Sequence, residues 1–316
     1  MHKRNWYFII VIILTISIYF INNDKKSTIA TDNRFEVTDT SLVTKIFLAD
    51  RNGNMITLTK NDDKWLVNNK FDVRRDAIST LLLTIKKIKI KKPVSNKAFD
   101  NVIKYMATTG VSVEIFSDNK MIKSYTIGSN TPDHLGTYML LKNSQKPYVI
   151  HIPAFNGFLS PRYGIQANAI DVNSWRSNSV FNLSFDAVKR LQYTDIQYNE
   201  NSYSLRTSPL TLINSEGNKI SFNKKKVLRL LNSFENLNCE TFKKNKSKID
   251  SATQLDELIV NSDTLRTYQI SKSISKSKEE NFTVKRRFAT LNDGELMLIQ
   301  DYVFNKVLIN INEIKE

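Results

Sequence analysis

The sequence has few of the residues that usually mark a metal site or a disulfide. Its 316 residues include one cysteine and three histidines. The lone Cys239 cannot form an internal disulfide, which excludes a small disulfide-held scaffold and leaves the redox compartment open. His2, His134 and His151 are scattered, with no paired carboxylate or cysteine spacing beside them. The sequence therefore supports no metal site.

Glycine is also scarce, with eight residues, and none of them is arranged as a phosphate-binding loop or a dinucleotide fingerprint. Ser273 and Lys276 have the Ser-x-x-Lys spacing of some serine acyl enzymes. They lie in a tract rich in serine and lysine that lacks the partner motifs needed to activate a nucleophile, so we interpret it as a solvated loop. The sequence predicts no catalytic residue, no cofactor and no evident small-molecule ligand.

Acidic residues are outnumbered, 31 against 46 basic residues, which gives a net charge of +15. Such a charge either attracts an anionic partner or reflects lysines spread over solvated faces. Two of the basic clusters form the polar faces of predicted helices, and none interleaves aromatic residues as a nucleic-acid platform does. We therefore predict no nucleic-acid partner. The clusters are residues 86–92, 224–229, 243–248 and 285–287.

Long apolar runs are absent except at residues 6–21, where only Thr15 and Ser17 are polar. With its flanking residues, this run is long enough to cross a hydrocarbon core of about 30 Å. A cleaved secretory signal is the alternative, but no small-x-small cleavage site follows the run. We predict an uncleaved, single-pass inner-membrane anchor. The basic residues Lys3 and Arg4 place the stub, residues 1–5, in the cytoplasm and the body in the periplasm.

The remainder is divided into three parts by its hydrophobic pattern. Residues 22–40 are polar and lack apolar periodicity, as expected of a spacer. Residues 41–165 form a first half, in which strand-like segments precede and follow two predicted helices, residues 72–89 and 96–108. The lysines of residues 86–92 are assigned to the polar face of the first of these helices. Residues 166–316 form the second half.

The second half resembles the first in short matches. Residues 124–127 match 267–270, residues 136–141 match 294–299, and residues 149–150 match 307–308. Residues 77, 78 and 81 likewise match 227, 228 and 231. We therefore predict an α+β fold: after the transmembrane helix come two related halves, each an antiparallel sheet with helices on one face.

Residues 147–164 read as a hinge between the halves, because a short apolar strand is broken there at Pro153. Aromatic residues and arginines, the types enriched at protein contacts, concentrate in and just after it. They either fill the seam between the halves or bind a partner. The candidates are Phe155, Phe158, Arg162, Tyr163, Trp175 and Arg176.

A family resemblance rests on Trp65-Leu66-Val67, on residues 148–159 and on Arg162-Tyr163. In these motifs the chain, over residues 42–190, resembles the membrane-anchored Bacteroidota proteins of the family "domain of unknown function" 4340. The resemblance implies a single-pass envelope protein of unknown activity, and some relatives are encoded beside ABC-type transporter components linked to gliding. Pro153-Ala154-Phe155 stands where a Pro-Gly-Phe hinge is expected.

The function that these features favour is a non-enzymatic, membrane-anchored envelope module that binds a membrane or envelope protein, as an accessory to an ABC-type transporter for example. Two alternatives stay open. One is an enzyme of unknown class with its site at the seam between the halves, and the other is a passive structural spacer.

Overall fold

The computed structural model describes residues 35–243, 249, 252–270 and 285–316. The chain forms two compact units, and the boundary between them in the sequence lies between Arg176 and Ser177. The predicted anchor and most of the predicted spacer lie outside the described residues. Within the described ranges, no helix has both the length and the apolar character needed to cross a membrane.

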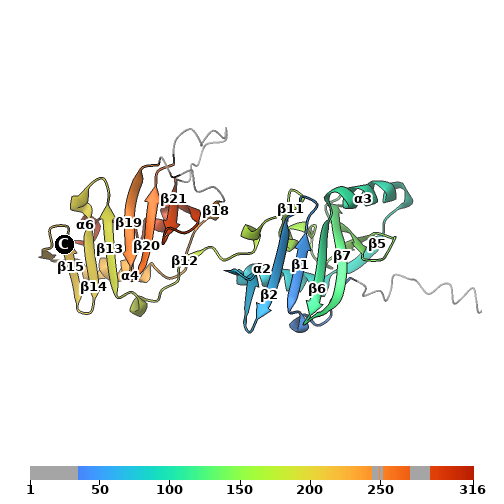
Figure 1. The fold of residues 1–316 in the computed structure, drawn as a ribbon, viewed down its shortest axis with the longest axis horizontal. Helices are drawn as coiled ribbons and strands as arrows, with labels where there is room; N and C mark the ends of the chain where they lie inside the picture. Colours follow the sequence, from blue (N-terminus) through green and yellow to red (C-terminus); the bar gives the residue numbers. More distant parts are fainter. Residues whose placement is uncertain (1–34, 244–248, 250–251, 271–284) are drawn as a thin grey trace, which may run out of the picture. The chain divides into compact units, whose positions relative to one another are not determined.

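Among the described residues, the first unit contains one antiparallel nine-stranded sheet and two α-helices (Figure 1). The strand order is β4-β3-β2-β1-β6-β7-β8-β9-β5. The strands are β1 (Lys45–Ala49), β2 (Met55–Asn61), β3 (Lys64–Val67), β4 (Phe71–Asp72), β5 (Lys89–Pro93), β6 (Val111–Ser117), β7 (Lys120–Asn130), β8 (Thr137–Leu141) and β9 (Tyr148–His151), and the helices are α2 (Arg75–Lys87) and α3 (Asn96–Thr109).

Alternation of apolar residues explains this sheet. On β1, Ile46 and Leu48 are fully buried while their neighbours are half-buried, so one face of the strand enters the core. Helix α2 buries Leu81 and Ile85 in the same cluster, because residues four apart lie on one helical face. The core of the unit therefore lies between α2 and one face of the sheet.

Residues 153–175, which we call the cover segment, pack against this core after β9. The segment contains the 3₁₀ helices η2 (Ser160–Tyr163) and η3 (Val172–Ser174) and the hairpin of β10 (Ile165–Gln166) and β11 (Ala169–Ile170). Two of its backbone N–H groups donate to side chains of the sheet region: Leu159 N to Thr137 Oγ1 of β8 at 2.8 Å, and Ile170 N to Asp50 Oδ2, just after β1, at 3.1 Å.

The second unit contains a nine-stranded antiparallel sheet in the order β16-β15-β14-β13-β19-β20-β21-β22-β18. Helix α4 (Lys224–Asn232) buries Leu230 and Leu231 in its core. The strands of this sheet are β13 (Arg190–Asp195), β14 (Tyr203–Thr207), β15 (Leu210–Asn214), β16 (Lys219–Ile220), β18 (Thr241–Lys243), β19 (Gln254–Val260), β20 (Asp263–Tyr268), β21 (Arg286–Leu291) and β22 (Leu296–Gln300). The described residues of the unit also form a separate pair, β12 (Ser179–Phe181) with β17 (Leu237–Asn238), and the short helices α5 (Asp301–Phe304) and α6 (Ile311–Ile314).

The α+β prediction is confirmed at the level of two large antiparallel sheets with a few helices. The two strand orders also correspond position by position, with β1 in the place of β13 and β5 in the place of β18. Leu81 and Leu231, matched in the sequence, are both fully buried. Helix α3 has no described counterpart in the second unit.

Two of the sequence matches were wrong by one strand. Residues 136–141 form β8, whose counterpart in the strand order is β21, but the match joined them to β22. Residues 149–150 lie in β9, whose counterpart is β22, but the match joined them to residues after α5. The reason is that β21 begins with Arg286 and Arg287, which do not look like a buried strand, whereas β22 is buried almost throughout.

Two predicted boundaries also need correction. The division between the halves lies after Arg176 rather than after residue 165, because Ile170 and Trp175 belong to the first core. The hinge, residues 147–164, is therefore part of the first unit. The spacer ends earlier than predicted, since Phe35 and Val37 are buried in the first core.

The lysine-rich end of the predicted helix 72–89 is a strand instead. Helix α2 stops at Lys87, and Ile88 has an extended backbone. The lysines at 89, 91 and 92 belong to β5, which pairs only with β9 and forms the sheet edge. Lysines on an edge strand discourage pairing with other chains, so this cluster has a structural explanation.

A turn in the cover segment places alanine where glycine is favoured. Phe155 N donates to Ile152 O at 3.0 Å, with Pro153 and Ala154 between them. Ala154 has φ 62°, in the left-handed region. For a residue with a Cβ atom, this region costs roughly 1–2 kcal/mol.

We expect Ala154→Gly to raise the stability of the first unit by roughly 0.5–1 kcal/mol, because relief of this strain exceeds the added flexibility of the unfolded chain. Urea unfolding followed by the fluorescence of Trp65 and Trp175 measures it. Ala107→Gly, at an exposed position of α3, is the control and should lower stability by about 1 kcal/mol. A loss of stability in both variants would contradict the strain argument.

Candidate functional site

The structure separates the six candidate residues into two groups. Tyr163, Trp175 and Arg176 are buried, and the first two belong to the core of the first unit. Their side chains are therefore not exposed for contact with a partner. Phe155, Phe158 and Arg162 are half-buried and keep an accessible side.

The buried group is fixed by close packing. The Tyr163 hydroxyl lies 2.9 Å from that of Tyr125, and burial raises the pKa of both phenols. Gly164, with φ 66°, lies against the Trp175 ring, where an added Cβ would come within 2.8 Å. The Arg176 guanidinium lies 3.8 Å from the centre of the Phe71 ring. All these contacts are internal to the first unit.

Arg162 and Trp175 meet at a cavity of about 220 Å³ beside the start of α2, which also receives Arg74. We call it the arginine cavity. Arg162 donates to Thr84 Oγ1 at 3.3 Å and stacks over Phe155 at 4.3 Å, so its guanidinium is held in place. Arg74 donates to Ser174 O at 3.2 Å.

Donors of two kinds in the residues that line this cavity lack a side-chain acceptor. No side chain caps the start of α2, so N–H groups of its first turn have no side-chain acceptor. The Trp175 Nε1–H is buried and has no hydrogen-bond partner in the part of the chain that the structure describes. Asp76 is nearby, with Oδ1 3.8 Å from Arg74 Nε, but its side chain is mostly exposed. The cavity is therefore suited to an anionic group.

A larger cavity, of about 500 Å³, is lined by other residues of the cover segment and by residues of α3 and β7. None of its lining residues is Asp, Glu, Lys or Arg, so we call it the neutral cavity. Its aromatic residues are Tyr105 of α3, His134 and Phe158. Asn130 and Asn168 supply amides. It shares no lining residue with the arginine cavity.

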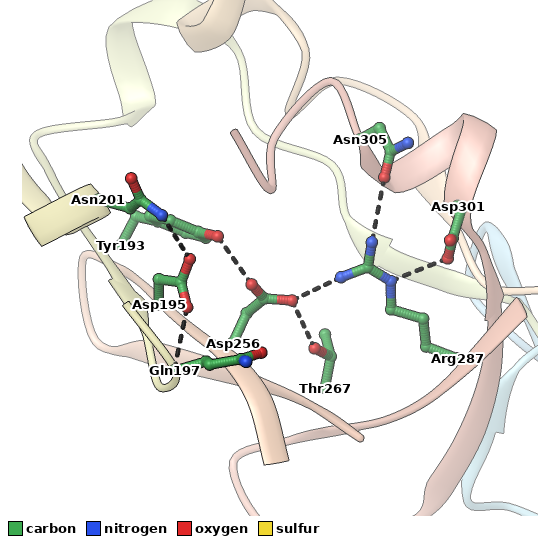
Figure 2. Close-up of polar contacts among 9 residues, drawn as sticks. All are labelled: Tyr193, Asp195, Gln197, Asn201, Asp256, Thr267, Arg287, Asp301 and Asn305. Atoms are coloured by element: carbon green, nitrogen blue, oxygen red, sulfur yellow. Dashed lines mark hydrogen bonds and ion pairs between the residues drawn. The ribbon is translucent and has the colours of Figure 1, made fainter. Parts of the chain in front are cut away.

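The second unit holds a charged row instead, shown in Figure 2. Asp256 Oδ1 accepts from the Tyr193 hydroxyl at 2.7 Å, and its Oδ2 accepts from Thr267 Oγ1 at 2.8 Å and Arg287 Nη1 at 2.6 Å. Arg287 Nε donates to Asp301 Oδ1 at 2.8 Å. A cavity of about 370 Å³ adjoins the row.

The row's electrostatics favour a fixed network. Burial lowers the pKa of Arg287, but the hydrogen bond to Asp301 and the charge of Asp256 outweigh it and hold that pKa above its usual range. Burial and the Asp256 carboxylate raise the pKa of Tyr193 far above its ordinary value. The Asp256 carboxylate thus accepts from three donors of the row itself. Within the described ranges, no group of three or more potential ligands could hold a metal ion.

The strand register shows which residues of the first sheet stand at the positions of the charged row in the second sheet. Asp256 pairs with Thr267 in the second sheet, at the positions where Val111 pairs with Ile127 in the first. Arg287 likewise stands in the place of Thr137. The same end of the sheet is therefore apolar and covered in the first unit but charged in the second.

The fold and cavities define a two-unit, antiparallel α+β protein with a candidate anion site in its first unit. A family model described as "Domain of unknown function (DUF4340)" matches residues 65–258, which is more than half of the chain. The chain belongs to this family. No curated protein and no solved structure matches it. The membrane anchor and the bacterial group that the resemblance implied stay predictions.

The sequence reasoning missed Arg74, both cavities of the first unit, and the charged row. A signal for the row was present at Asp256: the alternation of its strand predicts burial there, and a charge at such a position calls for a partner. Tyr105 and Asn168 gave no comparable signal, because only the fold joins them across 63 residues, with a hydrogen bond of 2.5 Å.

We expect Asp256→Ala to destabilise the second unit by roughly 3 kcal/mol, because it leaves Arg287 buried with fewer acceptors. Glu257→Ala is the matched control: this next residue pairs with the partly exposed Arg266 at 2.8 Å and should cost under about 1 kcal/mol. Hydrogen exchange of residues 254–268 is the measurement, with residues 111–127 as an internal reference. Equal losses in the two variants would show that the row is not a special constraint.

Proposed function

We propose that this chain is a non-enzymatic, membrane-anchored envelope module that binds an acidic group of a membrane or envelope protein in the arginine cavity. Residues 6–21 cross the inner membrane, residues 1–5 lie in the cytoplasm and the body lies in the periplasm. The observation that carries the proposal is the meeting of Arg74, Arg162 and the uncapped start of α2 at one cavity.

Its chemistry favours a carboxylate. A guanidinium binds a carboxylate through two parallel hydrogen bonds, and the N-terminal end of a helix carries partial positive charge. Two arginines and unpaired N–H groups therefore offer more donors than a single acidic side chain needs. An Asp or Glu side chain, or a C-terminal carboxylate, fits a cavity of about 220 Å³.

The stack of Arg162 on Phe155 supports protein recognition. A guanidinium held over a ring and bonded to Thr84 loses little freedom on binding, so more of its interaction energy appears as affinity. Arginine and aromatic residues also dominate the energetics of protein interfaces. Phe158 lies instead at the neutral cavity. The first partners to test are ABC-type transporter components, which the family resemblance suggests.

The two units are further proposed to derive from an internal duplication. Their identical succession of nine strands supports this, as does a helix placed between the fourth strand and the far edge strand of each sheet. On this view the arginine cavity belongs to the copy that acquired the cover segment.

The topology is tested with reporters fused after Glu316. Alkaline phosphatase should be active there and a cytoplasmic reporter inactive, because the charges of Lys3 and Arg4 keep the N-terminus inside. Changing both residues to glutamate should weaken this orientation. The opposite reporter pattern in the wild type would overturn the assignment.

Partner binding is tested with a photocrosslinking residue at Gln166, an exposed residue that lines the arginine cavity. In native membranes we expect a crosslink to a discrete protein that Arg162→Glu reduces at least tenfold, because the reversed charge repels a carboxylate. The control variant, Arg51→Glu, makes the same charge change at an exposed turn and should leave the crosslink intact.

A crosslinking residue at Met55 serves as the control for nonspecific crosslinking, because Met55 is 64% exposed and lies outside the cavity. Melting temperatures of all variants confirm folding. A Gln166 crosslink that survives Arg162→Glu, or that matches the Met55 pattern, would contradict the assignment of the cavity.

A further inference from the structure

We propose that the neutral cavity binds a neutral saccharide between α3 and the cover segment. This site is independent of the proposed protein contact, since the two cavities have no lining residue in common. Its volume, about 500 Å³, falls in the range of roughly 300–1,000 Å³ that small-ligand pockets occupy.

The lining has no formal charge, although 24% of the chain's residues are charged. A phosphate, a carboxylate or an amine would lose its water there without gaining an opposite charge, which is costly. The ligand class that this lining accepts is therefore polar but uncharged.

Aromatic residues supply flat apolar surfaces on two sides of the cavity. Tyr105 comes from α3 and Phe158 from the cover segment, and His134 lies 5.9 Å from Phe158 between ring centres. A pyranose ring presents apolar C–H groups on its faces, which pack against aromatic rings through dispersion and weak C–H contacts.

Amides and hydroxyls supply the polar contacts. Asn168 Oδ1 accepts from the Tyr105 hydroxyl at 2.5 Å, and Asn130 Oδ1 accepts from Ser160 Oγ at 3.3 Å. Among the described residues neither amide uses its Nδ2 donors in a recorded hydrogen bond, so these remain for a ligand. Sugar hydroxyls both donate and accept, as do the side chains lining this cavity.

A peptide fits this site less well than a saccharide. Extended peptides are bound by addition to a strand edge, but β7 is already paired with β6 and β8 on both sides. The nearby hairpin of β10 and β11 has only two residues in each strand. The polar groups here are side chains from separate elements. Such groups can form hydrogen bonds with hydroxyls at different positions of one compact sugar ring.

The test uses the full chain in detergent with maltotriose, cellotriose and chitotriose as probes. Saturation-transfer NMR identifies binding and calorimetry measures the affinity. We expect at least one trisaccharide to bind with a Kd of about 1 mM or tighter. Tyr105→Ala and Asn168→Ala should each weaken it roughly tenfold, whereas Tyr105→Phe keeps the ring and should lose less.

Matched controls are Tyr302→Ala and Asn61→Ala, both exposed and outside the cavity, which should leave binding unchanged. Oligogalacturonate, an anionic saccharide, should bind more weakly than the neutral probes. The proposal is overturned if none of the three trisaccharides binds, if an uncharged Ser/Asn peptide binds in their place, or if Tyr105→Ala and Asn168→Ala leave the affinity unaltered.

The outcome is separable from that of the partner experiment. Arg162→Glu should leave saccharide affinity unchanged, and Tyr105→Ala should leave the Gln166 crosslink unchanged. A loss of both properties in either variant would point to a general disturbance of the cover segment and would count against two independent sites.

Discussion

Both cavities of the first unit depend on how the cover segment is held at the end of the sheet. Its backbone donates to Thr137 near one end and to Asp50 near the other. Burial raises the pKa of Asp50, but hydrogen bonds from Asn54, Ile170 and Asn52 outweigh it and leave that pKa below its usual value. A charged acceptor thus fixes a loop in which Tyr163 and Trp175 are buried and which contributes lining residues to both cavities.

The two units differ in the residues that fill the same end of their sheets. In the first, Val111 and Ile127 continue the apolar face to the end of the sheet, where both are buried and line the neutral cavity. In the second, Asp256 and Thr267 occupy the corresponding strand positions, Arg287 stands in the place of Thr137, and Asp256 accepts hydrogen bonds from both of the other two. A buried charge is tolerated only when it is paired. Replacing apolar residues by the row is therefore stable only when Asp256 and Arg287 are both present. The shared strand order accommodates either solution.

The two proposed binding sites use residues of the cover segment that differ in charge. The side with Arg162 offers fixed positive charge beside the uncapped α2, whereas the side with Phe158 offers aromatic rings and amides without charge. The excess of lysine elsewhere, as on the edge strand β5, has a separate role in protecting a sheet edge. Net charge alone is therefore a poor guide to what this protein binds.

The sequence by itself determined the antiparallel class, the position of α2 and the burial of Leu81 and Leu231, because alternation and helical spacing are local properties of the chain. It also singled out Arg162. Only the tertiary structure decided that Trp175 is core, that Arg74 joins Arg162, and that Tyr105 meets Asn168. These contacts depend on strand register and on the path of the cover segment, which are set by pairings between residues distant in the sequence.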